Sequence, residues 1–210
     1  MNLCFQDVLT EEKQVRELIG NSSEVAKHKS IHHIDSYCRE FIAKTPLIFI
    51  STSDKEGNCD VSPRGDAAGF VLVLDDKHLV IPERPGNRRI DSVRNILSSP
   101  RIGLIFLIPG LEETLRINGR ACITKNPELM NRMQAREKTP LLGIGVEVEE
   151  CYVHCAKAFK RSQTWEAGSW LNQDLLPKVS KMLVAHVNRQ DFTEEIIAKG
   201  LKESYEKRLY

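Results

Sequence analysis

The hydrophobic pattern of the chain changes its period near residue 46. Before this point, apolar residues recur at helical spacing and predict two helices. The first helix follows Thr10 and stops at Gly20, and the second starts at Ser22 and stops before Thr45-Pro46. After residue 46 the apolar residues form short runs or alternate with polar ones, which is the pattern of strands.

Turn sequences separate these runs, and two of them, Asp54–Asn58 and Asp75–Lys77, predict hairpins. The segment from Asn87 or Asp91 to Ser98 has helical spacing, and Asn126-Pro127 predicts another helix that runs to Met133. The predicted strand runs lie at residues 47–52, 59–62, 70–74, 79–82, 102–108, 114–124 and 144–148. They do not alternate with helices as βαβ units, so we expect five or six antiparallel strands in a small β-barrel decorated by helices.

The C-terminal part returns to helical spacing. It predicts one helix near Asp174 to Asn188 and another from Thr193 toward the C-terminus. We therefore expect a mainly β fold of the α+β class with two regions. Residues 1–165 would form a barrel domain with N-terminal helices, and residues 166–210 a C-terminal helical extension.

Composition narrows the possible functions. The 210 residues carry a formal net charge of +1, which disfavours nucleic-acid binding as the main task. No apolar run approaches the ~20 residues that span a bilayer, and residues 1–7 do not resemble a signal peptide, so we expect a cytoplasmic protein without a membrane partner. Cys151, His154 and Cys155 lie close in sequence, but their spacing favours packing over a metal site.

Arginines nevertheless gather at two places where a backbone can present donors to an anion. One is the turn Ser62-Pro63-Arg64-Gly65-Asp66, and the other is Pro85-Gly86-Asn87-Arg88-Arg89 at the start of a helix. The N–H groups of such a loop and the helix dipole favour a phosphate. The alternatives are a surface ion pair between Arg64 and Asp66 and a solvated basic turn.

A third group of arginines lies on one face of the strand from Thr114 to Thr124. Arg116 and Arg120 alternate there with apolar residues, so each must be paired, solvated in a cleft or bound to a ligand. Glu112 and Glu113 could pair with them. Strand alternation allows this face to lie on the same side of the barrel as the first two groups.

A basic and aromatic segment follows. If it is helical, His154, Lys157 and Arg161 share one face, and Trp165 could cover a planar ring. The alternative is a solvated helix edge with Trp165 in the core.

Together these motifs resemble the pyridoxamine 5′-phosphate oxidase-like flavoproteins, whose FMN-binding domain is a six-stranded antiparallel split barrel. The resemblance covers residues 25 to 165 and rests on the combination of motifs rather than on any one of them. The matching pieces are Ser62–Asp66, Pro85–Ser92, Asn95–Pro100, Glu113–Arg120, His154–Ala158 and Arg161-Ser162.

The resemblance implies a homodimer that holds FMN at the subunit interface. Arg64 and the segment from Asn87 to Ser92 would hold the phosphate, and the His154–Trp165 segment would close the site, from either subunit. The full set of implied cofactor-binding residues is Ser62, Arg64, Ile81, Pro82, Asn87, Arg88, Arg89, Ser92, Thr114, Arg116, Lys157, Arg161 and Trp165.

Two departures separate this chain from the true oxidases of the family. Asp91-Ser92 stands where those oxidases carry a lysine, so Arg88 or Arg89 would have to substitute for it, and their C-terminal substrate signature is not recognisable. The resemblance therefore implies an FMN-dependent oxidoreductase whose small-molecule substrate or electron donor is unknown, and it does not imply vitamin B6 oxidation. The alternatives are a non-catalytic FMN carrier or sensor, and a split-barrel protein that uses haem or a deazaflavin.

Overall fold

The computed structural model describes residues 4–210. The chain divides into two compact units, Met1–Ser30 and Ile31–Tyr210, which are described separately. In the first unit lie helix α1 (Glu12–Ile19) and helix α2 (Glu24–His28). At the start of α1 the Glu11 N–H donates to the Gln14 side chain at 3.2 Å, and Gly20 ends the helix with φ of 75°. The first predicted helix is confirmed.

The second predicted helix is wrong in its length. Helix α2 ends at His28, and a separate helix α3 (Ser36–Ala43) begins after Asp35, whose side chain accepts the Cys38 N–H at 2.7 Å. Ile31, between the two helices, forms a β-bridge with Cys151 through hydrogen bonds of 2.9 and 2.7 Å. This bridge requires an extended backbone, which no continuous helix could supply.

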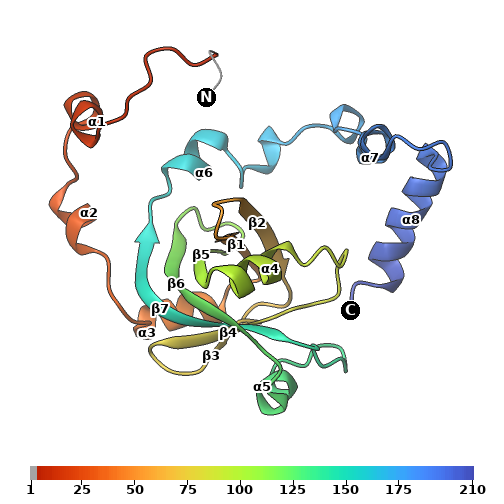
Figure 1. Cartoon of the computed structure of the whole chain (residues 1–210), viewed down its shortest axis with the longest axis horizontal. Helices are drawn as coiled ribbons and strands as arrows, with labels where there is room; N and C mark the ends of the chain where they lie inside the picture. The colour runs from red at the N-terminus through yellow and green to blue at the C-terminus, as the bar shows by residue number, and fades with distance from the viewer. Residues whose placement is uncertain (1–3) are drawn as a thin grey trace. The chain divides into compact units, whose positions relative to one another are not determined.

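The second unit is built on one antiparallel sheet (Figure 1). Its strands lie in the order β2-β1-β5-β6-β7-β4-β3, with the sheet open between β2 and β3. The strands are β1 (Leu47–Ser53), β2 (Cys59–Gly65), β3 (Leu72–Val73), β4 (His78–Pro82), β5 (Arg101–Leu107), β6 (Thr114–Thr124) and β7 (Gly143–His154). The α+β class and the split-barrel arrangement are confirmed. The sheet has a seventh strand because the two residues of β3 pair with β4.

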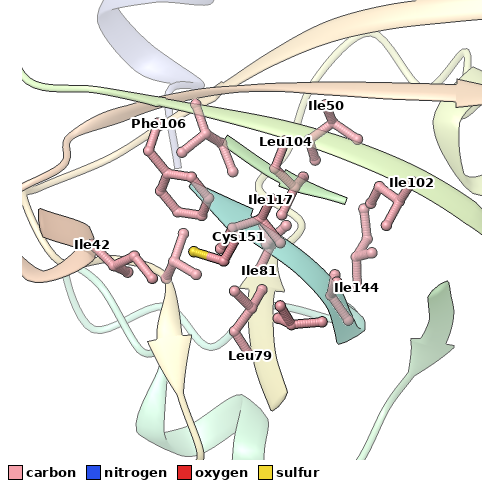
Figure 2. Close-up of a cluster of buried hydrophobic side chains, with 14 of the residues drawn as sticks. Ile42, Ile50, Leu79, Ile81, Ile102, Leu104, Phe106, Ile117, Ile144 and Cys151 are labelled. Carbon is pink, nitrogen blue, oxygen red and sulfur yellow. The ribbon is translucent and has the colours of Figure 1, made fainter. Parts of the chain in front are cut away.

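The core fills the concave side of this sheet. Figure 2 shows Phe106, Leu104 and Ile117 meeting Leu79 and other residues from strands distant in sequence. Each of these side chains is almost fully removed from water. A buried aliphatic or aromatic side chain contributes about 1.5–3 kcal/mol, so this cluster is the main source of stability for the unit.

Two helices cover parts of the sheet. Helix α4 (Asp91–Ser98) packs against β1, β2 and β6 and buries Val93 and Ile96. Helix α5 (Pro127–Arg132) begins after Asn126, whose side chain accepts the Glu128 N–H at 3.0 Å. Both helices follow the sequence prediction, and α4 starts at the later of its two predicted positions.

A β-bulge interrupts the long pairing of β6 with β7 between Asn118 and Gly119. A Cβ at Gly119 would lie 2.0 Å from the Glu147 carbonyl oxygen, so only glycine fits there. The bulge lets the two strands bend together around the core.

The C-terminal helices are α6 (Lys157–Ser162), α7 (Val179–Val187) and α8 (Glu194–Lys207). Helix α7 starts five residues later than predicted, because Pro177 lies inside the predicted range and only a short 3₁₀ turn, Gln173–Leu175, precedes it. Helix α8 begins after Thr193, as predicted, and packs against α7. A boundary between the barrel and this extension after residue 165 stays a prediction. Every helix within residues 4–210 is too short or too polar to cross a bilayer.

Candidate functional site

Five strand ends lie at the same edge of the sheet. The register places Leu47 of β1 opposite both Gly65 of β2 and Leu107 of β5, and it places Thr114 of β6 opposite His154 of β7. The prediction that Arg64 lies in a turn past the strand is wrong, because the residues from Ser62 to Gly65 belong to β2. This end of β2 and the predicted aromatic segment after β7 lie at the same edge.

Two ion pairs join the end of β2 to the residues after β4. Arg64 Nε lies 3.0 Å from Glu83 Oε2, and Arg84 Nε lies 2.6 Å from Asp66 Oδ2. Each of the two segments supplies one arginine and one acid, so the two ion pairs run in opposite directions between the segments. Strands β2 and β4 are not neighbours in the sheet, so these side chains link its two open ends. The sequence alternative of an ion pair between Arg64 and Asp66 is wrong, because each residue pairs across the opening instead.

The loop from Pro85 to Ile90 carries unusual backbone angles. Arg88 and Ile90 have φ of 61° and 56°, in the left-handed region that disfavours side chains other than glycine. Each such residue costs about 1–2 kcal/mol, and such angles cluster at ligand sites. Figure 1 shows this loop as the long connection that enters α4.

Ile90 is also the N-cap residue of α4, and its side chain offers no hydrogen bond to the first turn. The N–H groups there are left for water or an anion. Asn87 accepts the Arg89 N–H at 3.0 Å, and Arg89 Nε lies 2.8 Å from Asp91 Oδ2. Hydrogen bonding and charge from Asp91 raise the pKa of Arg89 above its ordinary value.

A carboxylate lies within this arrangement. Asp60 Oδ2 accepts hydrogen bonds from Ser62 Oγ at 2.9 Å and from Ser92 Oγ at 2.6 Å. Ser92 is buried at the start of α4, so Asp60 ties β2 to that helix. The sequence interpretation missed Asp60. The sequence spacing of Asp60, Ser62 and Arg64 could have indicated Asp60, because strand alternation places all three side chains on one face of β2.

The remaining predicted residues gather around the start of β6 and the segment after β7. Trp165 Nε1 donates to the Leu111 carbonyl at 3.0 Å, and its ring stacks on Phe159 with centroids 5.7 Å apart. Thr114 is buried, whereas Lys157 and Arg161 are exposed on α6. His154 belongs to β7 rather than to this helix, so the predicted three-residue helix face is wrong.

Arg116 contacts an aromatic ring instead of the predicted acids. Its guanidinium carbon lies 5.8 Å from the centroid of the Tyr152 ring. Glu112 pairs with Lys160 of α6. Arg116 thus has an aromatic partner in place of Glu112.

Arg64 and Arg116 lie on opposite faces of the sheet. Arg64 is level with Ile48 of β1, which is fully buried in the core. Arg116 is level with Ile105 of β5, whose side chain is 40% exposed on the other face. Within one chain the structure thus forms two groups of predicted residues, and it does not bring the Arg116 face onto the side of Arg64.

Ile81 and Pro82 belong to neither group. They pair with Ile144 and Gly143 of β7, and both are buried. The Ile81 side chain is part of the hydrophobic core, so only its backbone could approach a ligand.

A cavity of about 390 Å³ lies beside the ion pair between Arg84 and Asp66. Asp66 and Arg84 line it, together with residues of α3, the loop after β2 and the end of α5. Burial by itself would raise the pKa of Asp66, but hydrogen bonds from Tyr210, the Ala67 N–H and Arg84 outweigh it and lower the pKa below its ordinary value. Asp66 is therefore a stable anion at the mouth of this cavity.

This split antiparallel barrel, with a basic loop leading into a helix N-terminus, defines the class of protein. The family model described as pyridoxamine 5′-phosphate oxidase matches residues 34–155. The chain belongs to that family. No curated protein matches the chain.

Solved structures with a similar fold include HupZ of Group A Streptococcus. It is 19% identical with a TM-score of 0.47, over 57% of this chain and 93% of that chain. A putative pyridoxamine 5′-phosphate oxidase of Lactobacillus delbrueckii is 20% identical with a TM-score of 0.46, over 58% and 95%. A FAD-binding protein of Mesorhizobium loti is 14% identical with a TM-score of 0.39, over 60% and 99%. Similarities at this level add no function to the family assignment.

Proposed function

We propose that the chain binds FMN and acts as an oxidoreductase, with the FMN phosphate at the loop that enters α4. The observation that carries this proposal is the contact of Asp60, near the start of β2, with the uncapped start of α4, directly after the strained backbone at Arg88 and Ile90. Guanidinium groups, serine hydroxyls and helix N–H groups are the donors that a phosphate dianion requires. FMN is the phosphate carrier that the family resemblance implies.

Within this proposal, Arg64, Arg88 and Arg89 neutralise the phosphate. Ser62 and Ser92, whose hydroxyls donate to Asp60 in the structure, would turn from Asp60 to donate to the phosphate when it binds. When bound, the flavin ring would supply the hydride or electron transfer. Arg116 would donate to the N1–O2 edge of the ring and stabilise negative charge there.

The placement of Arg64 and Arg116 on opposite faces supports a homodimer. One flavin that contacts both residues would lie between two chains, with the phosphate loop from one and the Arg116 face from the other. Thr114, Lys157, Arg161 and Trp165 surround the same start of β6 and would accompany Arg116. The small-molecule substrate or electron donor would reach the flavin at this interface, in the cytoplasm.

Removal of two phosphate ligands tests the proposal. We expect the double variant R64A/R88A to bind FMN about 100-fold more weakly, because each charge-assisted contact contributes about 1.5–3 kcal/mol and 1.4 kcal/mol is tenfold. Quenching of FMN fluorescence during titration measures the affinity. The matched control is R189A, which removes an exposed arginine that pairs with Asp191. A double variant that keeps its yellow colour through purification would contradict this phosphate site.

A second experiment separates the enzyme from a non-catalytic carrier. Anaerobic addition of NADH or NADPH to the FMN-loaded protein should bleach the flavin absorption if the chain is an oxidoreductase that uses a nicotinamide donor. Flavin that stays oxidised with both nicotinamide donors but is bleached by dithionite, the positive control, would favour the carrier or sensor.

A further inference from the structure

Tyr210 is held by four side chains that the proposed FMN site does not use for the phosphate. It follows helix α8, and its hydroxyl donates to Asp66 Oδ1 at 2.5 Å. Its ring lies 4.6 Å from the guanidinium carbon of Arg136 and 6.0 Å from that of Arg84. Lys138 Nζ donates to the main-chain oxygen of Tyr210 at 2.7 Å. We call Asp66, Arg84, Arg136 and Lys138 the tyrosine socket.

The walls of the tyrosine socket are fixed by contacts that do not involve Tyr210. Arg84 Nη2 donates to the Met133 carbonyl at 2.8 Å, while its Nε holds Asp66. Asp66 Oδ1 also accepts the Ala67 N–H at 2.8 Å, and the Asp66 side chain is only 2% exposed. A carboxylate held by these contacts keeps its position when Tyr210 leaves, so the acceptor is preorganised.

A strained turn presents the basic side of the tyrosine socket. Ala135 and Lys138 exchange hydrogen bonds of 3.1 and 2.9 Å, and the two residues between them, Arg136 and Glu137, have φ of 47° and 62°. Two successive positive φ values are typical of a type I′ turn, which prefers asparagine and glycine. Here the turn uses an arginine, and the strained backbone aims the Arg136 guanidinium at the Tyr210 ring.

We infer that the tyrosine socket is a binding site for a phenol, occupied in this structure by Tyr210. A buried carboxylate accepts the hydroxyl hydrogen, and two guanidinium groups attract the electron-rich ring faces. Asp66 and Arg84 also line the cavity of about 390 Å³, so a phenol larger than the tyrosine side chain has room beside them. The phenol comes either from Tyr210 or from a free phenolic molecule. This site does not depend on the binding of FMN.

Competition between Tyr210 and a free phenol tests the inference. The probe is p-cresol, and its matched control is p-methylanisole, which has the same ring but no hydroxyl hydrogen. We expect p-cresol to bind Y210A about tenfold more tightly than it binds the wild-type chain, because the socket is then empty. Saturation-transfer NMR titration of the full-length chain measures both affinities. We expect p-methylanisole to bind Y210A at least fivefold more weakly than p-cresol does.

Two further variants keep the test decisive. Y210F retains the ring and loses only the hydroxyl, and D66N combined with Y210A removes the charged acceptor. Y210F should bind p-cresol with an affinity between those of wild type and Y210A, and D66N/Y210A should lose the preference for p-cresol over p-methylanisole. Equal p-cresol affinity in wild type and Y210A, or no preference for p-cresol in Y210A, would overturn the inference. Neither result would bear on FMN binding, which the Arg64 and Arg88 variants test.

Discussion

At the scale of single residues, the proposed phosphate site contains acids as well as bases. Glu83 pairs with Arg64, and Asp60 accepts from both Ser62 and Ser92. These contacts hold the donors in place before any ligand binds. They also reduce the positive charge that a phosphate would meet, so the acids set the affinity of the site as well as its geometry.

Removal of the Glu83 charge should therefore tighten FMN binding. We expect E83Q to bind FMN about fivefold more tightly, because one nearby negative charge costs the phosphate about 1 kcal/mol in this partly exposed setting. FMN fluorescence quenching measures the change, and E56Q in the exposed turn between β1 and β2 is the control. Weaker binding by E83Q would show instead that Glu83 supports the ligand.

Asp60 and Glu83 show what the sequence could not reveal about the site. Ser62 and Ser92 meet at Asp60, and Arg64 lies on the same face of β2, but the acidic partners of Arg64 and Ser92 come from 19 and 32 positions away. Such pairings depend on which strand ends meet in space. Local spacing along β2 could have indicated Asp60, whereas nothing local indicates that Glu83 reaches Arg64.

At the scale of elements, the bulge at Gly119 shapes the longest strand pair. Strands β6 and β7 stay paired on both sides of it, so the bend between their two halves depends on one residue without a Cβ. The predicted range of β6, Thr114 to Thr124, is confirmed residue for residue because its alternation is regular. The bulge itself leaves little trace in that alternation.

Substitution of Gly119 should damage the whole unit. We expect G119A to lower the free energy of unfolding by about 3 kcal/mol or more, because its Cβ would overlap the Glu147 carbonyl oxygen and the backbone of both strands must shift. Urea denaturation followed by circular dichroism measures the change. The matched control, G86A, places its Cβ in open space and should change stability by less than about 1 kcal/mol. A G119A variant as stable as G86A would contradict the close approach.

The predicted element boundaries are wrong where a long-range contact overrides a local preference. Residues 22–43 have helical spacing, but the bridge between Ile31 and Cys151 breaks that helix. The pattern around His154 also allows a helix, but pairing with Thr114 keeps His154 in β7. In both cases the deciding partner lies more than 30 residues away in the sequence.

At the scale of the whole molecule, the strand runs and their turns were sufficient to predict a small antiparallel β-barrel. The resemblance implied its split form, and the sheet and the family assignment agree with both. The strand runs were not sufficient to place the arginines. Alternation sets the two faces within one strand, but only the register across β1 and β5 shows that Arg64 and Arg116 face opposite ways. This separation is the reason for proposing a site shared between two chains.

We propose that the ligand of this barrel is FMN. The most direct measurement is the visible absorption spectrum of the purified protein, followed by mass analysis of the ligand that heat denaturation releases. The proposal predicts flavin bands and a released ligand with the mass of FMN, bound at one molecule per chain. A haem Soret band, a released deazaflavin, or a colourless protein that takes up no added FMN would contradict it.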